Sequence, residues 1–232
     1  MTGVQKKAGQ ERAGQERAGK YQPPAGVEAE AEPGSRGRVL RNKLGIKRKR
    51  EMDWKEAEAL DAAHNASLMT VTTQTRFTAS ALCRMHRNWL GDIYEWAGQY
   101  RTVDVSKGGF TWPPAVLVPQ NMSNLEAGAL QENTPCRSGP LPEVARRMAM
   151  VHAELLLVHP FREGNGRLAR WLADLMALQA GWPNPVYGFV GNGSRRQRAR
   201  YLAAVKQGYL LRYDDLTGFF AEALERGLEA DV

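Results

Sequence analysis

The sequence predicts a mostly α-helical domain with one small β-hairpin. Apolar residues recur at intervals of three and four over several long stretches, which is the pattern of helices with one buried face. One short stretch instead alternates apolar and polar residues around a Gly-Gly pair, which is typical of a hairpin. At 232 residues the chain is long enough for one domain with a real core.

The helical spacing predicts six helices, over residues 54–69 with Asp53 as N-cap, 77–96, 141–158, 167–180, 194–207 and 214–228. The breaker Pro160 follows the third, and Gly181 and Pro183 follow the fourth. The hairpin is expected over 101–119, where Val103 and Val105 alternate with polar residues and a return strand follows Pro113 and Pro114.

Residues 1–38 are expected to form a disordered basic leader, and 39–228 the folded domain. The leader repeats AGQER in residues 8–17 and is then rich in Pro, Gly, Ala and Glu, so it buries too little apolar surface to offset its ordering entropy. Residues 1–50 hold 13 of the 32 Lys and Arg residues but 5 of the 25 acidic ones, so they carry +8 and the rest −1. The leader is therefore the one region of the chain expected to be able to contact nucleic acid. A leader that is only solvated and binds nothing is the favoured interpretation.

Composition excludes several classes of protein. The sequence contains no stretch of about 18 apolar residues, which is the length that a membrane span requires. The N-terminus also lacks the apolar region of a secretory signal. The two cysteines, Cys83 and Cys136, have no metal-ligand spacing, so a zinc site or a disulfide framework is not expected. These features predict a cytoplasmic protein without a membrane partner.

The segment HPFREGNGRLAR, residues 159–170, concentrates the reactive side chains. It joins two helices and opens the second, where free N–H groups and the helix dipole favour an anion. Gly164 and Gly166 let successive amides turn inward as a phosphate-binding nest, and Asn165 adds a side-chain donor. Arg167 and Arg170, three residues apart, project from one face, and arginine binds phosphate oxygens in bidentate fashion.

Glu163 and His159 complete this constellation. Bare phosphates would repel Glu163, but a Mg²⁺ ion held by one carboxylate and phosphate oxygens would explain it. His159, with an ordinary pKa near 6.5, can deprotonate a hydroxyl that attacks phosphorus. The pattern therefore predicts transfer from a nucleotide to a hydroxyl group.

The stretch HPFREGNGR resembles the HPFx(D/E)GNGR signature of Fic-domain proteins at every fixed position. Other segments are also similar to Fic sequences: NKLGI at 42–46, LGDIYEWAGQYRTV at 90–103, SKGG at 106–109 and AEL at 153–155. The resemblance covers roughly residues 39–220. Two departures are Leu156, where Fic sequences often have Asn, and the Pro113-Pro114 pair, which affects the return strand of the hairpin.

The resemblance implies a Fic-type helical bundle whose hairpin is a flap, and an adenylyltransferase that moves AMP from ATP to a Tyr, Thr or Ser hydroxyl of a target protein. His159 is then the general base, Glu163 the Mg²⁺ ligand, and Gly164, Asn165 and Gly166 the anion nest. Arg167 and Arg170 would bind the β- and γ-phosphates, and Tyr201 would lie near the adenine.

In the same comparison, Lys107 and Phe110 belong to flap 106–112, which docks the target by β-augmentation. Gly166 favours AMP transfer, because a Fic relative that transfers phosphate has lysine there. Transfer of UMP, phosphate or phosphocholine, and a non-catalytic interaction module, remain the alternatives.

Many Fic proteins are inhibited by the glutamate of an (S/T)xxxE(G/N) helix that pairs with the second arginine. Here Glu precedes Gly or Asn only at Glu132 and Glu163, and neither has Ser or Thr four residues earlier. The resemblance therefore implies a toxin-like enzyme restrained by a separate small antitoxin protein. A degenerate inhibitor within the chain is the alternative.

Other conspicuous residues are given structural interpretations. Three further histidines, His64, His86 and His152, are expected to be capping or surface residues. The aromatic residues Trp89, Tyr94, Trp96 and Tyr100 are expected to pack in the core and near the hairpin, and the arginines of SRRQRARY, residues 194–201, to form a solvated face.

Overall fold

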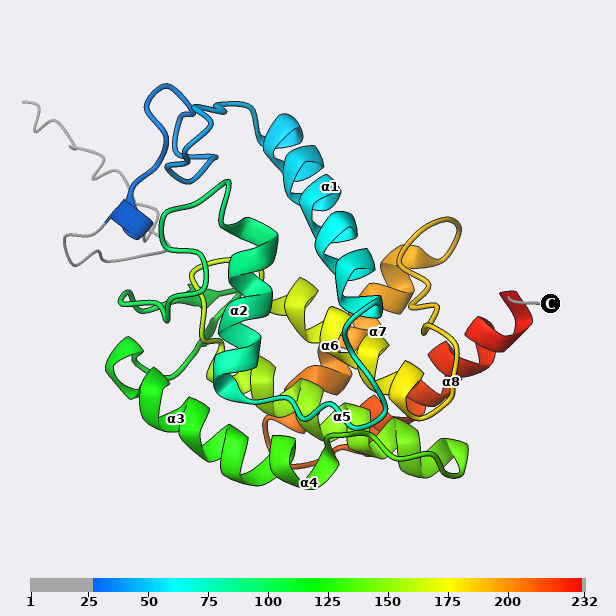
Figure 1. The fold of residues 1–232 in the computed structure, drawn as a ribbon. Helices are drawn as coiled ribbons and strands as arrows, with labels where there is room; N and C mark the ends of the chain where they lie inside the picture. The colour runs from blue at the N-terminus through cyan, green and yellow to red at the C-terminus, as the bar shows by residue number, and fades with distance from the viewer. Residues whose placement is uncertain (1–26, 231–232) are drawn as a thin grey trace, which may run out of the picture.

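The computed structural model describes residues 27–230, and it shows the predicted helical bundle with one short hairpin (Figure 1). The α-helices are α1 (Lys49–Leu68), α2 (Ala79–Leu90), α3 (Val118–Leu125), α4 (Gln131–Asn133), α5 (Leu141–Val158), α6 (Asn165–Gln179), α7 (Ser194–Gly208) and α8 (Asp214–Ala230). The hairpin pairs β1 (Ser106–Lys107) with β2 (Phe110–Thr111) in antiparallel register. Short helical turns lie at η1 (Val27–Ala29), η2 (Ala115–Leu117) and η3 (Glu126–Leu130).

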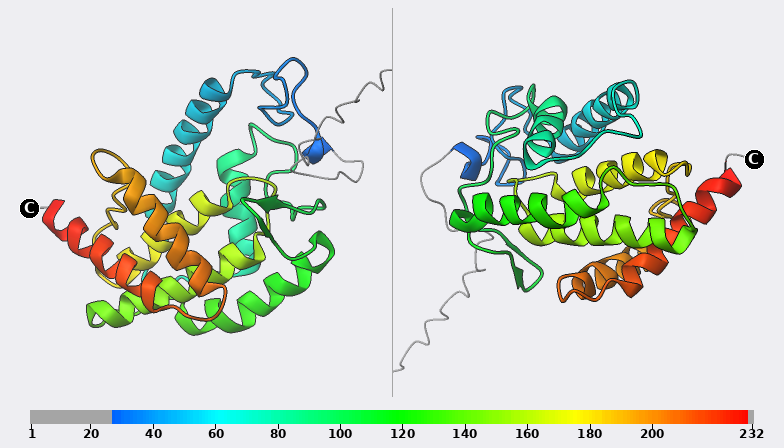
Figure 2. Two further views of the ribbon diagram at one scale, coloured as in Figure 1. Left: turned by 180° about the vertical axis from the view of Figure 1, so that it is seen from behind. Right: turned by 60° about the horizontal axis from the view of Figure 1, so that its bottom comes forward.

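Helix α5 is the centre of the bundle. Helices α6, α7 and α8 and the α3–η3 segment all pack against it, as the two views of Figure 2 show, while α1 and α2 pack together over α6. The side chains of Val144, Met148 and Leu155 are fully buried on α5. Because the apolar residues of α5 point to several sides, this helix is buried nearly all round, as expected for a central element.

The predicted helices are present, and two of their boundaries are shifted by more than two residues. Helix α1 begins at Lys49 rather than after Asp53, and Asp53 forms an ion pair with Lys49 inside its first turns. Helix α2 ends at Leu90 rather than Trp96, because Gly91 and the tight turns that follow bring the chain back along α2. Its start at Ala79 is capped by Thr78, whose hydroxyl accepts a hydrogen bond from the Ala81 N–H at 3.1 Å.

The expected return strand after Pro113 and Pro114 is wrong. Each strand of the hairpin is only two residues long, and the chain continues as η2 and then α3, which has Pro119 in its first turn. A proline at this position is compatible with a helix start because the first N–H groups of a helix have no internal partner. The β-branched residues Val116 and Val118 had suggested a strand, but tertiary packing of Val118 and Met122 against the core selects a helix.

The boundary of the folded domain also differs from the expected residue 39. Residues 27–38 lie within the described part of the chain and pack on the domain: Glu28 and Ser35 are buried. The Glu28 carboxylate accepts hydrogen bonds from the N–H and hydroxyl of Thr102, and the Glu28 carbonyl accepts one from Arg162 Nε at 2.8 Å. These polar contacts, which composition does not reveal, order a segment poor in apolar residues. Residues 1–26 of the predicted leader lie outside the described residues.

Most of the residues given structural interpretations behave as predicted. Trp89, Tyr94 and Trp96 are buried in the core and Tyr100 is half-buried, while Arg195, Arg196, Arg198 and Arg200 are exposed on α7. Within residues 27–230, no helix combines the length and the apolar character that a membrane span requires.

Candidate active site

The loop between α5 and α6 is shaped by two residues in left-handed conformation. His159 follows the last turn of α5 with φ 50°, and Gly164 precedes α6 with φ 87°. Phe161 is fully buried between them, and the Pro160 carbonyl accepts a hydrogen bond from the Arg101 N–H at 2.8 Å. The loop is therefore fixed at both ends and at its middle, and its outer face carries the side chains of His159 and Glu163.

This outer face lines a cavity of about 610 Å³. All ten residues predicted for the site line it: His159, Glu163, Gly164, Asn165, Gly166, Arg167, Arg170, Lys107, Phe110 and Tyr201. The cavity lies between the loop, the hairpin and one face of α7. Elements far apart in the sequence thus converge on the predicted site.

His159 is oriented so that one ring nitrogen is available as a base. Its Nδ1 lies 3.3 Å from the Leu156 carbonyl oxygen, which only accepts hydrogen bonds. Nδ1 therefore carries the proton of the neutral ring, and the lone pair is on Nε2. Burial lowers the pKa of His159 to about 4, so the ring is neutral at physiological pH.

Sequence reasoning missed the groups that hold this ring. The Trp112 side chain packs on the imidazole with ring centroids 4.0 Å apart, and its Nε1 donates to the Leu156 carbonyl at 2.8 Å. The Tyr209 hydroxyl donates to the same carbonyl at 3.3 Å. Trp112 is the last residue of the predicted flap 106–112, and this position is the signal that could have indicated its role.

The Asn165 side chain is not available to the predicted anion nest, which leaves the backbone N–H groups as its donors. Asn165 Oδ1 accepts the Phe161 N–H at 2.9 Å and its Nδ2 donates to the Phe161 carbonyl at 2.7 Å. The predicted side-chain donor is therefore already engaged, because the amide group closes the loop on itself. The consequence for the nest is indirect: Asn165 fixes the curvature that presents the N–H groups of α6 to the cavity.

The two glycines of the nest have different roles. A Cβ on Gly164 would lie 2.8 Å from Trp89 Cζ3, so positive φ and close packing both require glycine. A Cβ on Gly166 would meet only Arg170 Nη1, at 3.7 Å. Packing of the described residues does not require glycine at position 166. The absence of a side chain on Gly166 leaves open space beside Arg170.

The two predicted phosphate-binding arginines also differ. Arg167 forms ion pairs with Glu56 at 2.7 Å and with Glu163 at 3.3 Å, and its guanidinium lies over the Trp89 ring. Arg170 has no acidic side chain within ion-pair distance among residues 27–230. Its guanidinium lies over the Phe189 ring and hydrogen-bonds the Tyr201 hydroxyl. Of the two predicted phosphate-binding arginines, Arg170 is therefore the one without an ion-pair partner among the described residues.

Tyr201 is oriented by a histidine that had been expected to be a capping or surface residue. His152 is buried, with Nδ1 3.1 Å from the Ala169 carbonyl and Nε2 2.7 Å from the Tyr201 hydroxyl. Nδ1 therefore donates to the carbonyl and Nε2 accepts the tyrosine proton. The tyrosine oxygen is left to accept from Arg170.

His86 had also been expected to be a capping or surface residue, but it is fully buried where α2 faces the loop. His64 is half-buried, and its Nε2 lies 3.6 Å from Asp174 Oδ2. Both form polar contacts across the core: His86 Nε2 lies 3.0 Å from the Glu163 carbonyl. Their helical positions gave no indication of these partners, which lie 77 and 110 residues further along the chain.

Among the described residues that line the cavity, Glu163 is the only one with a carboxylate. Its side chain is about half exposed at the cavity mouth and accepts the Gly164 N–H at 3.0 Å. Within residues 27–230 no cluster of three metal-ligating side chains exists. One accessible carboxylate fits a Mg²⁺ ion that takes its other ligands from phosphates and water, and does not fit a metal site made by protein alone.

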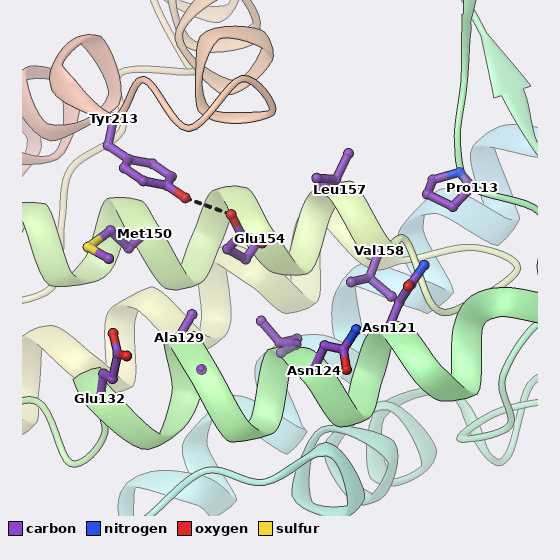
Figure 3. Close-up of a pocket in the computed structure, with 12 residues that line it drawn as sticks. Pro113, Asn121, Asn124, Ala129, Glu132, Met150, Glu154, Leu157, Val158 and Tyr213 are labelled. Carbon is purple, nitrogen blue, oxygen red and sulfur yellow. Dashed lines mark hydrogen bonds between the residues drawn. The ribbon is translucent and has the colours of Figure 1, made fainter.

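A second hollow, of about 460 Å³, lies on the other side of α5 (Figure 3). It is lined by α3, η3 and α5, and the Tyr213 hydroxyl donates to Glu154 at 2.6 Å on one wall. None of the predicted site residues borders it.

Comparison with known proteins agrees with the fold and the loop. Residues 76–177 match the model of the Fic/DOC family. The chain is 30% identical over 152 residues to a probable protein adenylyltransferase Fic of Salmonella typhimurium, covering 62% of this chain and 70% of that one. It is 28% identical over 144 residues to the protein adenylyltransferase VbhT of Bartonella schoenbuchensis, covering 62% and 30%.

Among solved structures, BepC of Bartonella tribocorum, crystallised with bound AMPPNP, superposes with a TM-score of 0.65 at 21% identity, over 79% of this chain and 91% of that one. The fold and the loop therefore define the class, and the chain belongs to the Fic/DOC family. It spans between 30% and 36% of the length of four of its curated relatives.

Proposed function

We propose that this protein transfers AMP from ATP to a hydroxyl group of a target protein. The observation that carries the proposal is that an oriented neutral imidazole, a backbone anion nest and an unpaired arginine line the same cavity. The names of the relatives support this chemistry, since several are protein adenylyltransferases.

In this proposal the nest and Arg170 bind the β- and γ-phosphates of ATP, and Arg167 contributes from its position beside Glu56. Glu163 would hold Mg²⁺, which would neutralise charge on the phosphate oxygens. The open space at Gly166 lets phosphate approach the backbone closely, which supports a nucleoside triphosphate as donor.

In the proposed transfer step one proton moves, one bond to phosphorus forms and one bond to phosphorus breaks. His159 Nε2 accepts the proton of the target hydroxyl while the oxygen of that hydroxyl attacks the α-phosphorus. The bond between the α-phosphorus and the bridging oxygen breaks, and pyrophosphate leaves. Bound phosphates raise the pKa of the imidazole by their negative charge, so the base becomes stronger when the donor is in place.

The target would dock along the hairpin. Its strands are two residues long and have unpaired outer edges beside the cavity, with Lys107 exposed and Phe110 packed on Tyr209 at 5.0 Å between ring centroids. An extended target segment can add to such an edge through backbone hydrogen bonds and present its hydroxyl to His159.

A separate antitoxin is part of the proposal. The chain contains no (S/T)xxxE(G/N) segment, and Arg170 has no acidic partner within residues 27–230. A small partner protein that brings a glutamate to Arg170 would block the γ-phosphate position. The antitoxin proposal is tested by co-expressing the protein with small proteins encoded by adjacent genes. The transfer activity is then measured as each candidate is added in increasing amounts.

The experiment that tests the function uses ATP labelled at the α-phosphate or at the γ-phosphate, with Mg²⁺ and a bacterial lysate. Label transferred to protein from the α-position alone is the expected result. Label from the γ-position alone would show phosphate transfer, and label only from UTP or a choline-containing nucleotide would show another transferred group. Absence of label from all donors would favour the non-catalytic module.

A further inference from the structure

The geometry points to His86 as a positioning residue that sets the direction of the first N–H group of the anion nest. This inference rests on the proposed nucleotide site. His86 belongs to α2, has no exposed surface and stacks on Phe161 with ring centroids 3.9 Å apart and planes 11° apart. Its ring does not line the cavity, so it acts on the nest through the backbone.

The hydrogen bonds of His86 define its protonation. The Gly98 N–H donates to Nδ1 at 2.8 Å, and a backbone N–H can only donate, so Nδ1 carries no proton. Nε2 therefore carries the proton of the neutral ring and donates it to the Glu163 carbonyl, 3.0 Å away. Both nitrogens are used, and no rotation of the ring can satisfy both partners otherwise.

The contact with Glu163 determines the orientation of a whole peptide unit. The Glu163 carbonyl and the Gly164 N–H belong to one planar trans peptide, so they point in opposite directions. Because His86 holds the carbonyl on the core side, the Gly164 N–H points to the outer side, where it meets the Glu163 carboxylate at 3.0 Å. This is the side that lines the cavity.

Without this contact the peptide would have an alternative. Gly164 has φ 87°, and the residue has no side chain to restrict rotation of the 163–164 peptide. A flipped peptide would present an oxygen to the phosphates instead of an N–H group. The Trp89 ring blocks movement of the Gly164 α-carbon, and His86 selects the peptide direction.

Gly98 completes the arrangement on the far side of His86. A Cβ at this position would lie 2.7 Å from Arg87 Cβ and 2.8 Å from the Cys83 carbonyl, and φ is 78°. Only glycine lets the backbone approach α2 closely enough for its N–H to reach Nδ1. The Gly98 contact thereby fixes the tautomer that the nest requires.

The test compares three variants. His86→Phe keeps the ring for stacking but removes both hydrogen bonds, and His86→Gln restores an acceptor and a donor side by side. Trp96→Phe is the matched control, because Trp96 packs against the His86 ring while its Nε1 has no partner to lose. Affinity for Mg²⁺-AMPPNP is measured by calorimetry, together with the Tm of each variant.

We expect His86→Phe to weaken AMPPNP binding roughly tenfold, as for the loss of one oriented donor to a charged group. His86→Gln and Trp96→Phe should stay within about threefold of the parent protein. Equal affinities of His86→Phe and Trp96→Phe would overturn the inference. Failure of the parent protein to bind AMPPNP would overturn the proposed function instead.

Ligand-free nitrogen-15 NMR spectra then decide the inference separately. In the parent protein the His86 ring should show a proton on Nε2 and none on Nδ1. The Gly164 amide resonance should move in His86→Phe and return in His86→Gln. A proton on Nδ1, or a Gly164 resonance that is the same in all three proteins, would contradict the positioning role.

Discussion

Arg167 and Glu56 form an ion pair of 2.7 Å that joins the start of α6 to α1, and the Glu56 side chain is almost fully buried. The other oxygen of the same carboxylate accepts the Tyr94 hydroxyl at 2.6 Å. Arg170, one turn further along α6, has no such partner in the part of the chain that the structure describes. One arginine therefore ties the site to the fold, and the other is available to a ligand.

Substitution of the two arginines by methionine should separate these roles. Arg167→Met leaves the Glu56 carboxylate buried without its partner, which should cost about 3 kcal/mol and lower the Tm by roughly 6–12 °C. Arg170→Met breaks no ion pair and loses the hydrogen bond to Tyr201 and the contact with Phe189, about 1 kcal/mol, so its Tm should fall by only roughly 2–4 °C. Its AMPPNP affinity should fall roughly 10- to 100-fold.

Thermal unfolding and calorimetry of both variants check this prediction. Adding Glu56→Gln to Arg167→Met should recover most of the lost stability, because the buried charge is then gone. If Arg170→Met were the less stable variant, the division of roles between the arginines would be wrong.

The two glycines of the nest provide a second matched pair. Gly164→Ala should lower the free energy of unfolding by about 2–4 kcal/mol, because of positive φ and the contact with Trp89. Gly166→Ala lies inside α6 and should raise it by about 0.5–1 kcal/mol, since alanine favours helix. Nucleotide affinity should nevertheless fall in Gly166→Ala. Unchanged affinity would show that phosphate does not approach this position.

Removal of the Tyr201 hydroxyl should affect both stability and Arg170. In Tyr201→Phe the buried Nε2 of His152 loses its partner, which should cost about 1–3 kcal/mol in urea unfolding. Arg170 loses the oxygen that orients it, so the KM for ATP should rise while the binding of adenosine stays the same. A rise in both constants would instead assign Tyr201 to adenine binding.

Three histidines with lowered pKa values, His86, His152 and His159, predict an acid-sensitive fold. Burial lowers the pKa of His86 and of His159 to about 4 and that of His152 to about 3, from 6.5 in the unfolded chain. Below pH 6.5 the unfolded chain therefore binds protons that the folded protein does not bind until about pH 4. Their effect on stability is absent above pH 6.5, and stability is lost as the pH falls from 6.5 to 4.

The predicted slope approaches three protons, about 4 kcal/mol per pH unit, near pH 5. Urea unfolding at pH 7, 6 and 5 measures it, and His86→Gln should reduce the slope by one proton. A free energy of unfolding that is constant between pH 6.5 and 5 would show that these rings are accessible to protons in the folded state.

The position of the loop could be predicted from the sequence, because residues 159–170 are contiguous and their spacing indicates a loop followed by the start of a helix. It also predicted the six long helices, whose apolar periodicity is strong. The return strand was wrong because Val116 and Val118 follow two prolines, a pattern that suits an edge strand as well as a helix start. Only the contacts of Val118 with the core distinguish the two.

The groups that support the loop could not be predicted from local pattern. Glu56, His86 and Trp112 come from three separate elements, and each is an ordinary helix or hairpin residue until the fold brings it to the loop. The Asn165 side chain was given the wrong partner for a similar reason. Its spacing allows contact with a ligand or with Phe161, and the turn of the loop selects Phe161.

The most direct test of the proposed chemistry is His159→Ala, assayed for both nucleotide binding and transfer. Among the described residues, the His159 side chain hydrogen-bonds the Leu156 carbonyl and none of the three residues 164–166, so the affinity for Mg²⁺-ATP should stay within about twofold. Transfer of α-phosphate label to protein should fall by a factor of about 10²–10⁴, as expected for removal of a general base. Label transfer at the parent rate, with binding intact, would contradict the assignment of His159 as the base.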